Sequence, residues 1–161
     1  MSGSATSSGP GGPGRWLIAA TAHSSAPVDV VWPLIGEARR WKEWSFLDRS
    51  DLLETGDPPP DGVGAVRRFT RFGIGSQEEV VVWDPPHHLG YTMLKGFPVR
   101  HYRADVRCTA DESGTMIQWS GTFDTLIPGT GHLLRAVLGR TISRFATGAA
   151  DYADQLQRRG T

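Results

Sequence analysis

The 161-residue sequence predicts an α+β fold, in which a curved seven-stranded antiparallel sheet and two short helices pack against one long C-terminal helix. Three observations predict it. Strand-length segments with alternating apolar residues fill most of residues 48–124, turn-forming segments separate them, and a helical apolar period follows. Because the connections are too short for crossovers, neighbouring strands are expected to run antiparallel. A curved sheet around one helix is the economical packing of these elements.

The two ends of the chain differ sharply in composition. Residues 1–14 consist mainly of Gly, Ser, Pro and Thr, so we expect a disordered N-terminal tail there and a single domain over residues 15–158. The tail has neither the basic segment nor the apolar segment of a secretory signal. No apolar run approaches the roughly 18 residues of a membrane-spanning helix. We therefore expect a soluble, cytoplasmic protein.

The domain begins with a predicted strand at residues 15–25 and two short helices. Pro27 suits the first turn of a helix whose apolar residues recur at helical spacing: Val28, Val31, Trp32 and Ile35. Pro33 and Gly36 are expected to kink this helix and end it early. Residues 37–44 then form a second short helix at an angle to the first.

Six further strands are expected, and Gly-, Pro- and Asp-rich turns separate them. They span residues 48–56, 62–72, 76–84, 88–95, 99–110 and 114–124. Alternation is cleanest in the fifth of these, where one face carries Tyr102, Ala104, Val106 and Cys108. In the last strand one face carries Ile117, Trp119, Gly121 and Phe123. These faces are expected to point into the core.

A long amphipathic helix is expected for about 25 residues after the turn at 127–131. Its apolar residues step by threes and fours and trace one stripe: Leu134, Leu138, Ile142, Phe145, Ala149, Tyr152 and Leu156. Charged residues such as Arg135 and Asp151 fall largely outside this stripe. The stripe is therefore expected to face the sheet.

The overall composition excludes several classes of function. Lys plus Arg and Asp plus Glu each number 17, and this balance is unlike the basic excess of nucleic-acid-binding proteins. It also gives no reason to expect recruitment to an acidic membrane surface. Cys108 is the lone cysteine, so no intrachain disulfide and no multi-cysteine metal site can form. We expect it to be a buried, inert thiol.

One charged pair is a candidate for chemistry. If the turn after the third strand centres near Gly73, strand pairing sets Arg67 opposite Glu78, where an ion pair is expected. The apolar residues that share the parity of Arg67 are Val63, Ala65 and Phe69, which favours an inward direction. An inward pair in an apolar interior is typical of recognition or proton chemistry. An outward pair would be a surface feature of little energetic consequence.

Other catalytic and metal-binding patterns are missing from the sequence. His87 and His88 lie in a turn, and His101 falls on the expected outer face. No His-x-His, His-Glu-x-x-His or cysteine pair supplies the three or four ligands that a metal needs. Ser120 lies in mid-strand without a nucleophile arrangement around it. We expect no metal and no cofactor.

Several sequence segments together resemble the START and birch-pollen-allergen type helix-grip superfamily. More narrowly, they resemble its bacterial polyketide cyclase/dehydrase branch, often abbreviated SRPBCC. The matching phrases are SAPVDVVWPLIGEARRWKEW, GVGAVRRF, EEVVVWDPPHHLGYTM, SGTMIQWSGTF and FATGAADYADQL, which are spread over nearly the whole chain after the tail. The resemblance implies a helix-grip fold with a deep, mainly apolar cavity between the sheet and the long helix. It also implies binding of lipids, aromatic polyketides or other small hydrophobic molecules there, and it carries no universal catalytic motif.

On that geometry the two short helices cap one end of the cavity, and Trp41 and Trp44 point at its mouth. Each ring can either line the cavity or plug the end of the core, because walls and plugs share the same composition. Plugging is favoured over lining. Further candidates for the cavity wall lie deeper: Tyr91, Tyr102, Trp119, Ile142 and Phe145.

Two functions are consistent with these residues. The first is a binding module that holds a small hydrophobic molecule, and it is the preferred hypothesis. The alternative is a polyketide cyclase or dehydratase, with Glu78 as base, Arg67 as oxyanion partner and Tyr91 or Tyr102 as proton donor. Modulation of a protein partner is a third, weaker hypothesis. The sequence names neither the ligand nor the oligomeric state.

Overall fold

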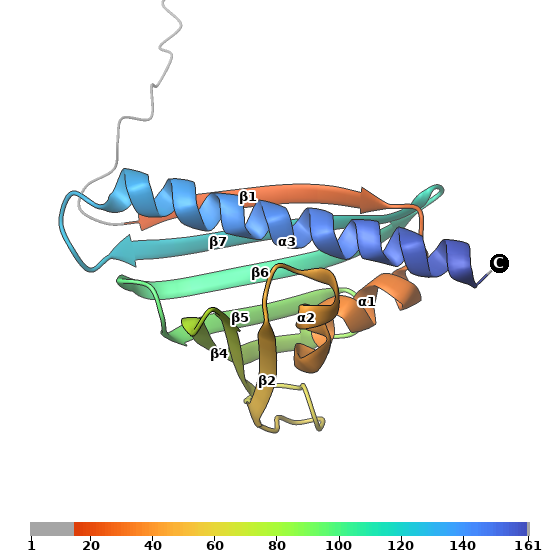
Figure 1. The fold of residues 1–161 in the computed structure, drawn as a ribbon, viewed down its shortest axis with the longest axis horizontal. Helices are drawn as coiled ribbons and strands as arrows, with labels where there is room; N and C mark the ends of the chain where they lie inside the picture. The colour runs from red at the N-terminus through yellow and green to blue at the C-terminus, as the bar shows by residue number, and fades with distance from the viewer. Residues whose placement is uncertain (1–14, 161) are drawn as a thin grey trace, which may run out of the picture.

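The computed structural model describes residues 15–160, so the tail predicted for residues 1–14 lies outside the described residues. Seven antiparallel strands form one sheet in the order β1-β7-β6-β5-β4-β3-β2 (Figure 1). The strands are β1 (Arg15–Ser24), β2 (Arg49–Glu54), β3 (Val66–Arg71), β4 (Ile74–Asp84), β5 (His88–Lys95), β6 (Val99–Asp111) and β7 (Gly114–Thr125). The predicted α+β class and the seven-stranded antiparallel sheet are confirmed.

The strand faces follow the alternation of the sequence. Tyr102, Ala104, Val106 and Cys108 of β6 are all buried, and so are Ile117, Trp119 and Phe123 of β7. The two strands pair along most of their length, with Val106 opposite Trp119. Burial raises the pKa of the Cys108 thiol to about 12, so this thiol stays protonated and unreactive at neutral pH.

The short helices differ in detail from the sequence prediction. Helix α1 (Val28–Gly36) continues through Pro33 and ends at Gly36 as expected, where the Glu37 amide donates to the Pro33 carbonyl and closes the last turn. Pro27 takes the cap position before the helix rather than its first turn. The predicted helix at 37–44 divides into a 3-10 turn, η1 (Ala38–Arg40), and a single α-turn, α2 (Trp41–Trp44).

Helix α3 (Gly131–Arg159) runs along the sheet, and α1 and α2 lie beside its C-terminal half (Figure 1). Small buried residues let that half approach its neighbours closely: Ala146, Ala149, Ala150 and Ala153. At Gly148, an added Cβ would lie 2.8 Å from the Trp44 carbonyl oxygen. Larger side chains, including Leu138, Ile142 and Phe145, occupy the preceding turns. The C-terminal half of α3 therefore packs closely against α2, whereas bulkier side chains hold the turns before it away from the sheet.

The two tryptophans of α2 are fixed by their indole N–H groups. Trp41 donates to the Ile35 carbonyl at 2.9 Å, and Trp44 donates to the Leu34 carbonyl at 2.8 Å. The Trp41 ring also stacks on Phe69 of β3, with 4.3 Å between ring centres. Because buried donors need partners, these two bonds set the position of α2 on the end of α1.

The turn between β6 and β7 gives a test of the fold. Gly114 has a φ of +144°, and a Cβ there would lie 2.0 Å from the Ser24 carbonyl oxygen. We expect Gly114→Ala to lower the free energy of unfolding by about 1–3 kcal/mol. A Cβ added at Gly139 of α3 would lie 3.7 Å from the Ile18 Cγ2, an ordinary contact distance, so Gly139→Ala is expected to raise stability by about 0.5–1 kcal/mol. Urea unfolding measures both, and shifts of the same sign would contradict this account.

Candidate functional site

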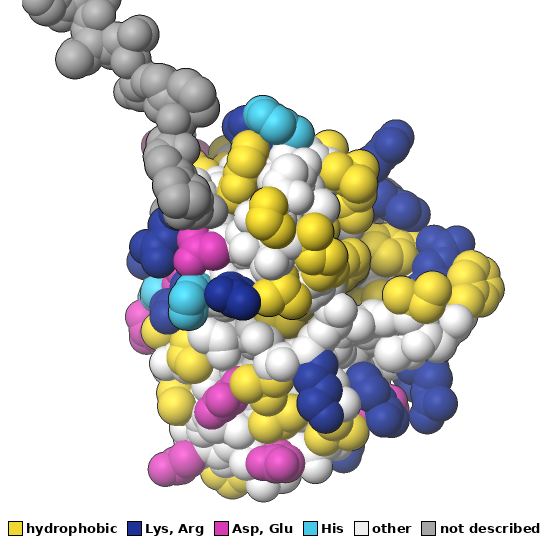
Figure 2. Space-filling model, turned by 90° about the vertical axis from the view of Figure 1, so that its left-hand side faces the viewer, with side chains coloured by type: hydrophobic (Ala, Val, Ile, Leu, Met, Phe, Trp, Pro, Cys, Tyr) yellow, Lys and Arg dark blue, Asp and Glu magenta, His cyan; other side chains and the backbone are white. Residues whose placement is uncertain are grey.

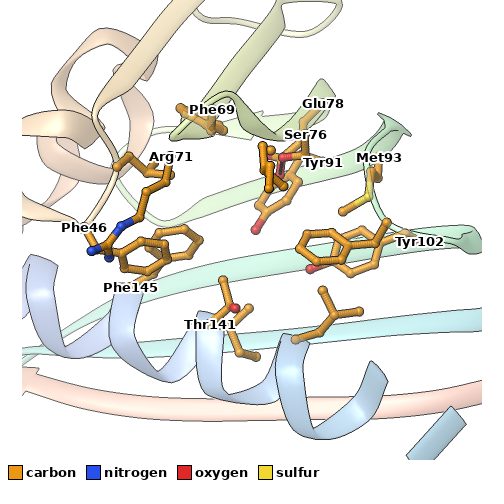
Figure 3. Close-up of a pocket in the computed structure, with 16 residues that line it drawn as sticks. Phe46, Phe69, Arg71, Ser76, Glu78, Tyr91, Met93, Tyr102, Thr141 and Phe145 are labelled. Atoms are coloured by element: carbon orange, nitrogen blue, oxygen red, sulfur yellow. Dashed lines mark hydrogen bonds between the residues drawn. The ribbon is translucent and has the colours of Figure 1, made fainter. Parts of the chain in front are cut away.

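A cavity of about 110 Å³ lies between α3 and the concave face of strands β3 to β6. Its walls are mainly apolar (Figure 3). The lining residues are Phe46, Leu47, Phe69, Arg71, Ile74, Gly75, Ser76, Glu78, Tyr91, Met93, Phe97, Tyr102, Leu138, Thr141, Ile142 and Phe145. Four of them come from α3, and most of the others come from β3, β4 and β5. The cavity is therefore the space left where the helix stands off the sheet.

A buried carboxylate forms part of this wall. Glu78 of β4 lies opposite Arg67 of β3 in the sheet register, and the Arg67 Nη2 donates to the Glu78 Oε2 at 3.1 Å. The Ser76 hydroxyl donates to the other oxygen, Oε1, also at 3.1 Å. Both charged residues are buried. The predicted cross-strand ion pair and its inward direction are confirmed.

Arg67 sits behind the cavity wall among aromatic rings. Its Cζ lies 4.9–5.0 Å from the ring centres of Trp41, Phe69 and Tyr91. Its Nε and Nη1 atoms have no hydrogen-bond partner among the described residues. Ring faces therefore supply part of the stabilisation that water gives an exposed guanidinium. This packing holds Arg67 in place, and Arg67 in turn holds the Glu78 carboxylate.

The protonation of the cavity groups is set by burial. Burial raises the pKa of Glu78 above its ordinary value, and the charge of Arg67 and the hydrogen bonds from Ser76 and Arg67 offset only part of this effect. Burial likewise raises the pKa of both Tyr91 and Tyr102. The two phenols are therefore neutral at pH 7 and can donate hydrogen bonds. The Tyr91 oxygen also accepts one from the Trp119 indole, at 3.0 Å.

The structure brings together five of the nine residues that the sequence nominated. Glu78, Tyr91, Tyr102, Ile142 and Phe145 line the cavity. Arg67 lies directly behind it, as described above. The three tryptophans, Trp41, Trp44 and Trp119, are buried in the aromatic layer that backs the wall and are not among the lining residues. Their indole N–H groups are already bonded within the protein.

Sequence reasoning missed the other lining residues. Met93 shares strand parity with Tyr91, and Arg71 shares parity with Phe69, so alternation could have found both. Thr141 lies one residue before Ile142, on the edge of the apolar stripe. Phe46, Leu47 and Phe97 lie in irregular segments, where no periodic signal exists.

The cavity reaches the surface at an apolar mouth. Phe72 and Ile74, on either side of the β3–β4 turn, are 81% and 78% exposed, and Ile74 lines the cavity. Further exposed apolar side chains come from the end of β5, the loop after β7 and the first turns of α3: Leu94, Leu126, Ile127, Leu133 and Val137. Figure 2 shows hydrophobic side chains gathered over this end of the molecule, with Lys and Arg side chains beside them. Exposed apolar clusters of this kind mark binding sites more often than single exposed residues do.

Other features of the described residues offer less chemistry. A second hollow of about 370 Å³ lies between α1 and the loop at 58–61, where Trp32 and Trp83 line it with prolines and charged residues. It lies outside the interface of sheet and α3. No group of three or more potential metal ligands occurs in residues 15–160. Over the same residues no helix is long and apolar enough to cross a membrane.

The family to which the chain belongs is established by its sequence. A family model described as polyketide cyclase / dehydrase and lipid transport matches residues 15–158, and the chain belongs to this family. The resemblance to the polyketide cyclase/dehydrase branch, which several sequence segments indicated, is thereby confirmed. No curated protein sequence matches the chain.

Solved structures show the same fold. The Zhui aromatase/cyclase from a Streptomyces species matches with a TM-score of 0.73 and 19% identity over 91% of this chain and 96% of that one. A START superfamily protein from Mycobacterium smegmatis matches with a TM-score of 0.73 and 12% identity over 87% and 98%. A protein from Thermobifida fusca matches with a TM-score of 0.70 and 26% identity over 88% and 93%. These likenesses show that the chain shares the fold of these proteins.

The buried ion pair predicts a pH-dependent effect on stability. In Arg67→Met, Glu78 loses the charge that opposes its desolvation, so its folded-state pKa rises further above the ordinary 4.5. An acid whose folded-state pKa is raised loses stability as pH rises through that pKa. We therefore expect a loss of about 3–5 kcal/mol at pH 8 and a smaller loss at pH 5, by urea unfolding.

The matched control is Arg68→Met, one residue along the same strand. Arg68 pairs with Asp51 at 3.0 Å, but its side chain is 38% exposed. This substitution is expected to cost less than about 1 kcal/mol at either pH. An equal cost of Arg67→Met at pH 5 and pH 8 would rule out the assigned role of Glu78 burial.

Proposed function

We propose that the protein binds one small hydrophobic molecule in the cavity between α3 and strands β3 to β6. The observation that carries the proposal is an apolar cavity with a held carboxyl group in its wall. Apolar walls with a few fixed polar groups are typical of small-molecule sites, where the polar groups orient the ligand. The description of the family, which joins polyketide cyclases with lipid transport, supports this class of ligand.

The cavity size limits how much of a ligand can be enclosed. An engineered cavity of roughly 150 Å³ binds benzene, so about 110 Å³ corresponds to a guest of one ring or a short chain. A two-ring molecule such as 2-naphthol, or a longer one, would extend through the mouth past Ile74 and Phe97. In this proposal Tyr91, Tyr102 and Phe145 contact the ligand. Trp41, Trp44 and Trp119 keep the wall in place by packing behind it.

A pair of matched substitutions on α3 tests ligand binding. Thr141 lines the cavity, whereas Thr147 is exposed on the same helix. We expect the protein to bind 2-naphthol, a neutral fluorescent probe, in a saturable manner. Thr141→Phe fills part of the cavity and is expected to weaken this binding at least tenfold, while Thr147→Phe changes it less than twofold. Fluorescence titration gives the affinities. Absence of saturable binding, or equal effects of the two substitutions, would count against the proposal.

Catalysis is the second candidate function, and the buried Glu78 favours it. Cyclisation of a poly-β-ketone needs removal of a proton next to a carbonyl, and subsequent dehydration needs loss of water. The Glu78 carboxylate can accept the proton, and the neutral phenol of Tyr102 or Tyr91 can donate a hydrogen bond to the enolate oxygen. Arg67 is behind the wall, so in this scheme it orients Glu78 instead of meeting the substrate. The likeness to the Zhui aromatase/cyclase supports the reaction class.

The enzyme hypothesis predicts a specific pH profile. With a poly-β-ketone substrate, kcat is expected to rise with pH as Glu78 ionises, through its raised pKa. Glu78→Gln is expected to lower kcat at least about 100-fold and to abolish this acid limb. The same variant is expected to retain 2-naphthol binding within about threefold. Unchanged turnover in Glu78→Gln and in Arg67→Ala would exclude the catalytic assignment and leave the binding proposal standing.

A further inference from the structure

Two arginine side chains lie against one aromatic ring of the cavity wall, Phe46. Arg71, the last residue of β3, lines the cavity, and its Cζ lies 5.7 Å from the ring centre of Phe46 (Figure 3). Arg144 of α3 lies over the same ring at 4.2 Å. Phe46 itself stacks on Phe145, with 5.1 Å between ring centres and an interplanar angle of 3°. Two guanidinium groups, one from the sheet and one from the helix, are therefore held at one aromatic ring.

Neither guanidinium has an acidic partner in the described part of the chain. Six other arginines form ion pairs with carboxylates: Arg15, Arg40, Arg49, Arg67, Arg68 and Arg103. Asp48 lies beside this end of β3, but its carboxylate accepts hydrogen bonds from the Phe72 amide and the Thr70 hydroxyl. Some exposed arginines elsewhere are also unpaired. Arg71 differs from them because it lines this cavity.

The surroundings of these two groups favour an anion. A guanidinium packed on an aromatic ring is weakly hydrated, and its planar fork fits both oxygens of a carboxylate. The Phe46 ring restricts both guanidinium groups before any ligand binds. The Phe72 ring, whose centre is 5.1 Å from the Arg71 Cζ, restricts Arg71 further. Arg71 and Arg144 are exposed, and the apolar body of a ligand packed against Ile74 and Phe145 would exclude water from them and strengthen the attraction.

We propose that the ligand is a hydrophobic carboxylic acid, whose carboxylate binds Arg71 and Arg144 at the mouth and whose apolar body fills the cavity. This inference rests on the proposed binding function and deepens it by naming the class of ligand. Arg71 and Glu78 appear on different sides of the cavity in Figure 3, with apolar and phenolic side chains between them. A hydroxyl group on the far part of the ligand would meet Glu78 and the two tyrosines.

The charges of the cavity distinguish an acid from other ligands. The Glu78 carboxylate is already neutralised by Arg67 and bonded to Ser76, so it offers no unpaired negative charge to a cation. A neutral ligand would leave Arg71 without a partner. An anion is therefore the ligand charge that completes the site.

Three eight-carbon probes with different head groups test the inference by isothermal titration of the full-length protein at pH 7.5. They are octanoate, 1-octanol and octylammonium. We expect octanoate to bind at least tenfold more tightly than either of the others. In Arg71→Met, and separately in Arg144→Met, the affinity ratio of octanoate to octanol is expected to fall below three. Raising NaCl from 50 to 500 mM is expected to lower the same ratio in the unmodified protein.

Arg107→Met is the matched control, because Arg107 is an exposed arginine of β6 that does not line the cavity. It removes one positive charge and is expected to leave the ratio unchanged within twofold. Equal affinities for octanoate and octanol would overturn the inference while leaving the binding proposal intact. A fall of the ratio in Arg107→Met as large as in Arg71→Met would also overturn it, since net charge would then explain the preference. Failure of all three probes to bind would instead overturn the proposed function.

Circular dichroism and thermal unfolding establish that each variant is folded before titration. Arg144 is exposed on α3, so Arg144→Met provides the decisive measurement should Arg71→Met fail to fold. Arg71→Lys keeps the charge and removes the planar fork. It is expected to give a ratio between those of the unmodified protein and Arg71→Met, and a ratio as low as that of Arg71→Met would contradict a role for charge at this position.

Discussion

A buried arginine constrains the inner wall of the cavity, and the surrounding elements are arranged around it. Taking an ion pair out of water costs several kcal/mol, which only good geometry and further favourable contacts offset. Here one bond to Glu78 and three ring faces supply those contacts. One of those rings, Trp41, is itself fixed by the Ile35 carbonyl. The position of α2 on α1 and the pairing of β3 with β4 are therefore energetically tied to the same charge.

The same arrangement explains why a cavity persists in a chain of this size. Alanines and Gly148 bring the C-terminal half of α3 against its neighbours, whereas Leu138, Ile142 and Phe145 hold the preceding turns away from β3 to β6. The aromatic layer behind the wall cannot collapse into the gap without breaking the indole hydrogen bonds. A rigid wall with one carboxyl group suits ligand binding, and it is equally a precondition for acid–base catalysis on a bound substrate.

Much of this could be predicted from the sequence, where a regular period carries the information. Strand alternation gave the inward faces of β6 and β7, and turn position gave the Arg67–Glu78 pair, because antiparallel register follows from turn geometry. The tryptophans show where such reasoning ends. An indole ring fits a cavity wall and a core plug alike. Only the structure shows that the Trp41 and Trp44 N–H groups donate to the Ile35 and Leu34 carbonyls and not toward the cavity. The mouth residues Phe46 and Phe97 lie in irregular segments, so no period could have revealed them.

The central claim is that the space between α3 and strands β3 to β6 holds the ligand. Nuclear Overhauser effects between the aromatic protons of bound 2-naphthol and assigned methyl groups test it most directly. We expect contacts to the methyl groups of Met93, Leu138 and Ile142, which line the cavity. Contacts confined to exposed methyl groups away from the mouth, such as those of Leu17 and Val63, would contradict it.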